Sequence, residues 1–81
     1  MNVRVRLFAV ARQAAGRDAV EVELPEGATI AELRDRLAIQ IPPLTGLLRH
    51  MTFAIDAQYV PLGAVLHPGA DVACIPPVSG G

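Results

Sequence analysis

Apolar residues alternate with charged residues in two stretches near the start of the chain, 2–8 and 20–24. This two-residue period is typical of strands with one buried face and one wet face. The stretch between them, 9–15, is rich in alanine and is followed by Gly16, which suits the left-handed end of a helix. We therefore expect two strands joined by a short helical turn, with the second strand antiparallel to the first.

A helix start follows, because Glu32 stands three residues after Thr29 and the two side chains can form a capping box. Apolar residues then recur at helical spacing, with charged residues on the other faces. These apolar positions are Ile30, Leu33, Leu37 and Ile41. We expect the main helix here, ended by the proline pair at 42–43. A short helical connection over 44–49 is the favoured interpretation of the next segment.

Alternation returns over 51–55, and a brief partner strand over 58–60 follows a turn at Asp56-Ala57. After another turn, the run 72–75 is apolar without interruption, which is typical of a central strand covered on both faces. One helix across a mixed sheet, with the first and last strands parallel at its centre, lets each layer bury its apolar face. The sequence thus predicts an α+β protein with the β-grasp (ubiquitin-like) fold and about five strands.

The last strand of such a sheet ends at its centre, so the residues after Ile75 are expected to leave the folded body. Pro76 and Pro77 lack backbone N–H donors and fix φ, which ends the strand and holds the exit extended. We therefore expect a β-grasp domain over 1–75 and an extended, free C-terminal tail over 76–81.

Two glycines, Gly80 and Gly81, close the sequence. Glycine has no Cβ, so a backbone made of it can enter a channel too narrow for side chains. This pattern suits a carboxyl group presented to the active site of another protein. The α-carboxylate of Gly81 is accordingly the candidate reactive group.

Composition narrows the chemistry. A chain of 81 residues with 52% hydrophobic content is expected to form one ordered domain with little room for an enclosed active site. The single cysteine, Cys74, excludes an internal disulfide framework and favours a reducing, cytoplasmic setting. We interpret it as a buried structural thiol. His50 and His67 have no ligand spacing, so no metal site is expected.

Charge and hydropathy also exclude some partners. The net charge is −1 and the arginines are scattered, so neither a basic stripe nor an aromatic platform for nucleic acid is expected. No apolar run approaches the ~20 residues needed to cross a bilayer, so no membrane partner is expected. All seven basic residues are arginine, so no lysine is present to accept an isopeptide bond.

The close of the chain, 71–81, resembles the C-terminus of the MoaD-type sulfur carriers, the small subunits of molybdopterin synthase. The start agrees, because Leu7-Phe8-Ala9 followed by Arg12 and Gly16 is similar to that family's first strand and turn. The helix opening over 25–33 fits as well. The resemblance covers essentially the whole chain and places it within the MoaD/ThiS ubiquitin-like sulfur carriers. The ending Pro-Pro-Val-Ser-Gly-Gly is its most specific part.

The resemblance implies a function. An E1-like enzyme would use ATP to adenylate Gly81, and a sulfurtransferase or cysteine desulfurase would supply the sulfur of a thiocarboxylate. This sulfur would pass to cyclic pyranopterin monophosphate in the large catalytic subunit, forming the dithiolene of molybdopterin. The chain would be a non-catalytic, sulfur-donating subunit with no bound cofactor. A heterotetramer of two small and two large subunits is implied.

The same resemblance assigns site residues. Pro76, Pro77, Val78, Ser79 and Gly80 would thread the tail into the partner. An apolar docking surface would contain Phe8, Leu62, Ile75 and Val78. Phe8 and Ile75 also suit the protein core, which is the simpler interpretation of these two. Leu62 and Val78 suit a surface position better.

Other functions share these features. Sulfur carriers for thiazole (thiamine) or cysteine biosynthesis would differ in the acceptor of the sulfur. A ubiquitin-like protein modifier would instead be joined through Gly81 to lysines of its targets. A plain binding module would have an inert tail, and its function would survive a change at Gly81.

Overall fold

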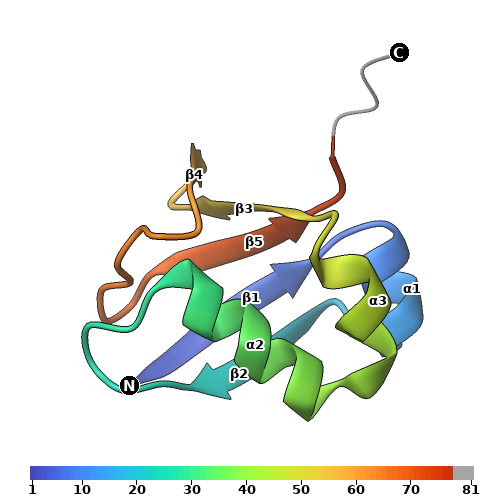
Figure 1. The fold of residues 1–81 in the computed structure, drawn as a ribbon, viewed down its shortest axis with the longest axis horizontal. Coiled ribbons are helices and arrows are strands. Elements are labelled where there is room, and N and C mark those ends of the chain that lie inside the picture. Colours follow the sequence, from blue (N-terminus) through green and yellow to red (C-terminus); the bar gives the residue numbers. More distant parts are fainter. Residues whose placement is uncertain (78–81) are drawn as a thin grey trace.

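The computed structural model describes residues 1–77. Five strands form one mixed sheet in the order β2-β1-β5-β3-β4. Helices connect the strands at one end of this sheet and across one of its faces (Figure 1). The elements are β1 (Asn2–Leu7), α1 (Val10–Ala15), β2 (Ala19–Glu23), α2 (Ile30–Gln40), the 3-10 turn η1 (Pro42–Leu44), α3 (Thr45–Leu48), β3 (Thr52–Ile55), β4 (Gln58–Val60) and β5 (Asp71–Ile75).

The pairing of the strands confirms the β-grasp prediction. β1 pairs with β2 in antiparallel fashion and with β5 in parallel fashion. β3 is antiparallel to both β5 and β4. The first and last strands therefore lie side by side at the centre of the sheet, as the order of the elements predicted. The β3–β4 hairpin turns at Asp56 and Ala57, which have positive φ values of 50° and 70°.

The local signals also placed the helices correctly. α1 ends at Ala15 and is capped by Gly16, whose φ of 74° is left-handed. Both halves of the capping box form at the start of α2, with Thr29 and Glu32 each accepting a backbone N–H bond at 3.3 Å. α2 ends at Gln40, and the segment that follows forms η1 and α3, which confirms a helical connection there.

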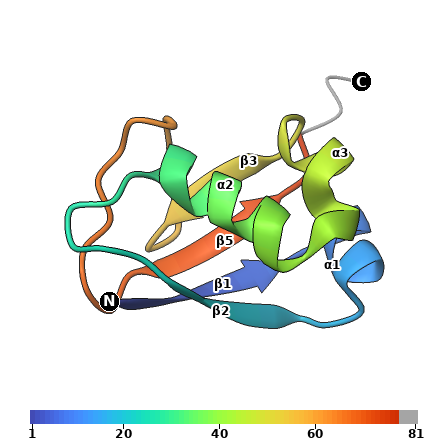
Figure 2. The ribbon, with the colours of Figure 1, turned by 60° about the horizontal axis from the view of Figure 1, so that its bottom comes forward.

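The core lies between the sheet and the helices. Figures 1 and 2 show α2 crossing one face of the sheet, with α3 beside it. The apolar side of each strand points to this layer, and its largest fully buried side chains are Phe53, Leu7, Ile30, Leu33, Leu37 and Leu44. Within residues 1–77, no helix is long and apolar enough to cross a membrane.

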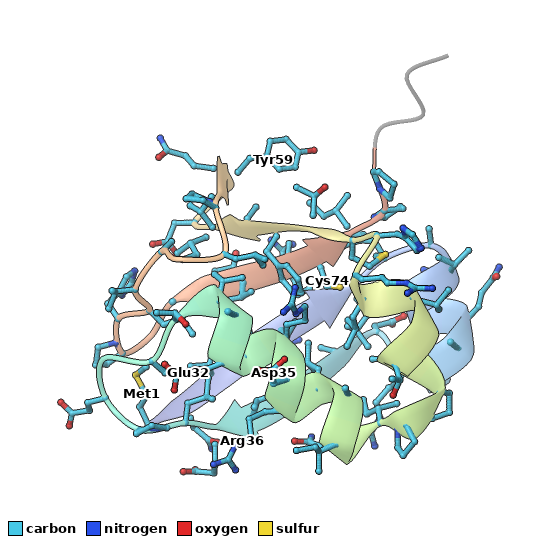
Figure 3. All side chains as sticks on the ribbon, in the orientation of Figure 1. Met1, Glu32, Asp35, Arg36, Tyr59 and Cys74 are labelled. Atoms are coloured by element: carbon cyan, nitrogen blue, oxygen red, sulfur yellow. The ribbon has the colours of Figure 1, made fainter. Side chains whose placement is uncertain are left out.

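The other face of the sheet, opposite α2, is the open face. The described helices cover only the opposite face, yet residues 72–74 of the central strand β5 are all buried, as expected. Ala73 and Ala54 are nevertheless buried on the open face. Ala73 lies in register with Ala54 and with Arg6, and Ala54 also lies in register with Tyr59. The longer side chains of Arg6 and Tyr59 flank the two methyl groups and shield them from solvent. Figure 3 shows Tyr59 projecting from the body.

Candidate functional site

The chain leaves the sheet from its central strand, β5. β5 ends at Ile75, and Pro76 and Pro77 continue away from the body (Figure 1). Without N–H groups the two prolines cannot extend the ladder, so the strand ends there. The other residues expected to act in the tail, Val78, Ser79, Gly80 and Gly81, lie outside the described residues.

Phe8 lies beside this exit. Its N–H donates to the carbonyl oxygen of Cys74 at 3.2 Å, immediately after the paired stretch of β1 and β5. The side chain is 39% exposed, so its assignment to the core was wrong. The reason is the parity of the strand, because residue 8 falls on the same face as Arg4 and Arg6. Ile75 is half-buried and also falls on the open face.

Leu62 is exposed to 42%, as expected of a surface residue. It follows β4, and its carbonyl oxygen accepts a hydrogen bond of 2.9 Å from the N–H of Ala31 in the first turn of α2. The structure thus brings Phe8 and Ile75 together and ties Leu62 to the start of α2.

Sequence reasoning missed an ion pair on the open face. The Arg6 guanidinium donates to both carboxylate oxygens of Asp71, Nε to Oδ1 at 3.1 Å and Nη2 to Oδ2 at 3.0 Å. The same guanidinium carbon lies 5.6 Å from the centroid of the Phe8 ring. One arginine therefore joins the start of β5 to the aromatic ring beside its end. The sequence could have indicated this pair, because Arg6 and Asp71 are solvent-facing residues of two strands that were predicted to lie parallel and adjacent.

A second missed contact also lies at the start of β5. Asp56 Oδ1 accepts the N–H of Asp71 at 3.0 Å, and Asp56 Oδ2 lies 2.9 Å from Nε2 of His67. The backbone bond from Asp71, followed by the bond from His67, lowers the pKa of Asp56. The carbonyl of Pro68, followed by Asp56, raises the pKa of His67. These groups fix the loop between β4 and β5.

Cys74 is fully buried under the helices (Figure 3). Burial raises the pKa of its thiol to about 12, because a thiolate would lose its hydration there. The neutral thiol is inert as a nucleophile, in keeping with a structural role. Among residues 1–77, no three His, Cys, Asp or Glu side chains are grouped to hold a metal ion.

The fold is a small β-grasp domain, and its central strand runs directly into Pro76 and Pro77. Ubiquitin-like carrier proteins have this architecture. The chain matches the ThiS family over residues 5–81 and belongs to that family.

Individual relatives agree with this assignment. The chain is 35% identical to the molybdopterin synthase sulfur carrier subunit of Chlamydomonas reinhardtii, with 100% of both chains covered. Relatives of the same name from other organisms are 30–33% identical.

Solved structures support the fold. SAMP1 from Haloferax volcanii is 27% identical, with a TM-score of 0.89 and 100% of both chains covered. The complex of subunits 1 and 2 of the molybdopterin-converting factor of Helicobacter pylori contains a chain that is 23% identical, with a TM-score of 0.70 and both chains covered to 100%. At that identity the second match bears on the fold alone.

Proposed function

We propose that this chain is the sulfur carrier subunit of a molybdopterin synthase and that Gly81 carries the sulfur. The observation that carries the proposal is the match to the Chlamydomonas reinhardtii subunit, which spans both chains in full. The fold supports this proposal, because the chain leaves the sheet at the end of β5 and continues through Pro76 and Pro77. Residues 1–75 form the folded domain and 76–81 the tail in this proposal.

The chemistry begins with activation of the tail. A carboxylate is a poor electrophile, since its leaving group would be oxide. The Gly81 carboxylate attacks the α-phosphorus of ATP in an E1-like enzyme and pyrophosphate leaves, which gives an acyl adenylate. The persulfide of a sulfurtransferase or cysteine desulfurase then attacks the acyl carbon and AMP departs, which gives an acyl disulfide. A second thiol attacks the donor's sulfur of this disulfide, so that a new disulfide forms and the thiocarboxylate leaves. ATP belongs to the activating partner, and the chain itself needs no cofactor.

The product is a thiocarboxylate, whose ionised sulfur is a nucleophile at neutral pH. In the large catalytic subunit this sulfur is donated to cyclic pyranopterin monophosphate to build the molybdopterin dithiolene. The carrier supplies the reacting atom, and the large subunit supplies position and acid–base groups. The chain is thus a sulfur-donating subunit rather than an enzyme by itself.

Docking of the folded domain on the large subunit would direct the tail into the active site of that subunit. Phe8 and Ile75 lie at the base of the tail, and Leu62 and Val78 complete the apolar docking surface of the proposal. Pro77, Ser79 and Gly80 enter the partner's channel, where Gly80 allows the backbone to pass. The relatives named molybdopterin synthase sulfur carrier subunit support a large-subunit partner. The assembly we propose is a heterotetramer of two small and two large subunits in the cytoplasm.

A second candidate is a protein modifier. SAMP1, named small archaeal modifier protein 1 in a second structure from Haloferax volcanii, shares the fold with a TM-score of 0.88 in that structure. In this alternative the activated Gly81 is transferred to lysine side chains of target proteins.

The test is the intact mass of the chain after incubation with ATP, an E1-like enzyme and a sulfur donor. A gain equal to one sulfur replacing one oxygen, absent from a variant extended by one residue after Gly81, supports a sulfur carrier. Adding the large subunit and cyclic pyranopterin monophosphate should then restore the original mass and yield molybdopterin. Covalent conjugates to target lysines without thiocarboxylate would favour the modifier.

A further inference from the structure

Three consecutive apolar residues, Phe8, Ala9 and Val10, are exposed where β1 passes into α1. Phe8 is 39% exposed and Val10 is 46% exposed. Their Cα atoms lie within about 8 Å of each other, because consecutive Cα atoms are about 3.8 Å apart. A run of exposed apolar residues is unfavourable in a soluble protein unless it binds a partner. We call these three residues the apolar ridge.

α1 packs with a small apolar residue inside and a larger one outside. Ala11 is fully buried, whereas Val10, the residue before it, faces solvent. Burying the valine would stabilise the fold more than burying the alanine, because the gain grows with the apolar area removed from water. The orientation of α1 is therefore not the one that hydrophobic burial alone would favour.

The backbone of Ala9 sets this orientation. Its φ of 52° and ψ of −124° lie outside the regions that residues with a Cβ favour. The turn carries the chain from β1 directly into α1, and the carbonyl oxygen of Phe8 accepts the N–H of Ala11 at 3.1 Å. Strained backbone of this kind persists only where surrounding contacts hold it, and it is concentrated at functional sites. Local backbone preference thus does not account for the exposed ridge.

The ridge adjoins the place where the tail leaves the sheet. The N–H of Phe8 donates to the carbonyl oxygen of Cys74, one residue before β5 ends at Ile75. α1 lies at the same end of the sheet as this exit (Figures 1 and 2). The ridge is therefore continuous with the docking surface at the base of the tail.

The length of the tail limits where a partner can lie. Gly81 follows Ile75 by six residues, so the chain between them can span at most about 22 Å. A protein that holds Gly81 in its active site must therefore lie over the end of β5. A standard interface covers roughly 800 Å² on each partner, which is a disc of about 16 Å radius. A disc centred on the exit includes Phe8 and reaches Val10.

We propose that the apolar ridge docks on the large catalytic subunit and that Val10 is a contact residue of that interface. This inference rests on the proposed function. The large subunit fits the ridge because the proposed synthase is a lasting assembly, and lasting interfaces are more apolar than transient ones. The activating enzyme must release the chain after each reaction, for which a smaller and more polar contact is suited.

Replacing the exposed valine tests the inference. Calorimetry compares the dissociation constants of Val10→Ser and wild type for the large subunit, using the full chain. Ile39→Ser is the matched control, because Ile39 is also a β-branched residue of a helix and is 77% exposed. Thermal melts confirm that each variant is folded. Two further measurements accompany them: kcat/KM for thiocarboxylation by the E1-like enzyme, and sedimentation of the chain alone.

We expect the dissociation constant of Val10→Ser to rise about fivefold, because the half-exposed valine has only part of its apolar area left to bury. Ile39→Ser should match wild type, and kcat/KM for thiocarboxylation should not change in either variant. An unchanged dissociation constant for folded Val10→Ser, or an equal rise in Ile39→Ser, would overturn the inference while the carrier function stands.

Other occupants of the ridge would give different results. A loss confined to thiocarboxylation would assign the ridge to the activating enzyme and overturn the inference. A wild-type dimer that Val10→Ser dissociates would assign the ridge to a second copy of the chain, which also overturns it. A wild-type chain that gains no sulfur with any E1-like enzyme would remove the proposed function and the inference together.

Discussion

Arg6 and Asp71 are joined by two parallel hydrogen bonds, of 3.1 and 3.0 Å, that connect the central strands β1 and β5. The residues are not direct partners in the register, since Asp71 lies opposite Arg4. The Arg6 side chain reaches back by two residues to make the contact. The pair therefore ties the start of β5 to the part of β1 that precedes Phe8.

Breaking this pair should cost little stability. Both side chains are about half exposed, and exposed ion pairs contribute about 0.2–1 kcal/mol. Because the geometry is bidentate, we expect a coupling free energy near the upper end of that range. Urea unfolding of Arg6→Gln, Asp71→Asn and the double variant measures it as a double-mutant cycle. A coupling of zero at low salt would show that the observed geometry adds nothing.

The Asp56–His67 pair should make stability depend on pH. The pKa of His67 is raised from 6.5, so its contribution is complete below 6.5 and is lost as pH rises through the folded-state value. The pKa of Asp56 is lowered from 3.8, so its contribution is complete above 3.8 and is lost as pH falls through the folded-state value. The pair therefore stabilises most between these two pH values.

Urea unfolding of wild type and His67→Gln across pH tests this dependence. The difference in unfolding free energy should be largest at mildly acidic pH and should shrink above neutrality. His50→Gln is the control, because His50 forms no ion pair in the part of the chain that the structure describes. A difference for His67→Gln that stays constant with pH would contradict the pairing.

Cys74 should be replaceable without loss of carrier activity. Its thiol is buried and its pKa is about 12, so it cannot serve as a thiolate at neutral pH. We expect Cys74→Ala to gain sulfur at Gly81 at the wild-type rate in the intact-mass assay. Cys74→Ser should be destabilised by about 1–3 kcal/mol, because a hydroxyl would be buried in an apolar layer. A folded Cys74→Ala variant that accepts no sulfur would assign the thiol a chemical role.

The capping box should be worth a measurable part of the stability. Thr29 Oγ1 accepts the N–H of Glu32 at the start of α2. Thr29→Ala removes this acceptor and should lower the unfolding free energy by about 1 kcal/mol, whereas Thr29→Ser should keep most of it. Thermal unfolding of both variants compares them directly. Equal losses would indicate that the methyl group, and not the hydroxyl, is what matters.

The fold was predictable because periods of two and of 3.6 residues separate strands from helices, and the stretches 2–8, 20–24, 30–41 and 51–55 each show one of them. The same parity could have placed Phe8, which falls on the arginine side of β1. The hydrophobicity of Phe8 favours the core, whereas its position on the strand favours the open face. The contacts of Asp56 with His67 were not predictable, since they depend on the path of the loop between β4 and β5.

Phe8 should matter for docking and little for folding. It is 39% exposed beside the tail exit, and exposed aromatic residues at the centre of an interface often dominate its binding energy. We expect Phe8→Ala to weaken binding to the large subunit by about tenfold or more, which corresponds to roughly 1.4 kcal/mol. Ile39→Ala is the control, since Ile39 is 77% exposed on α2. Equal dissociation constants for Phe8→Ala and wild type, measured by calorimetry, would move the docking surface away from the base of the tail.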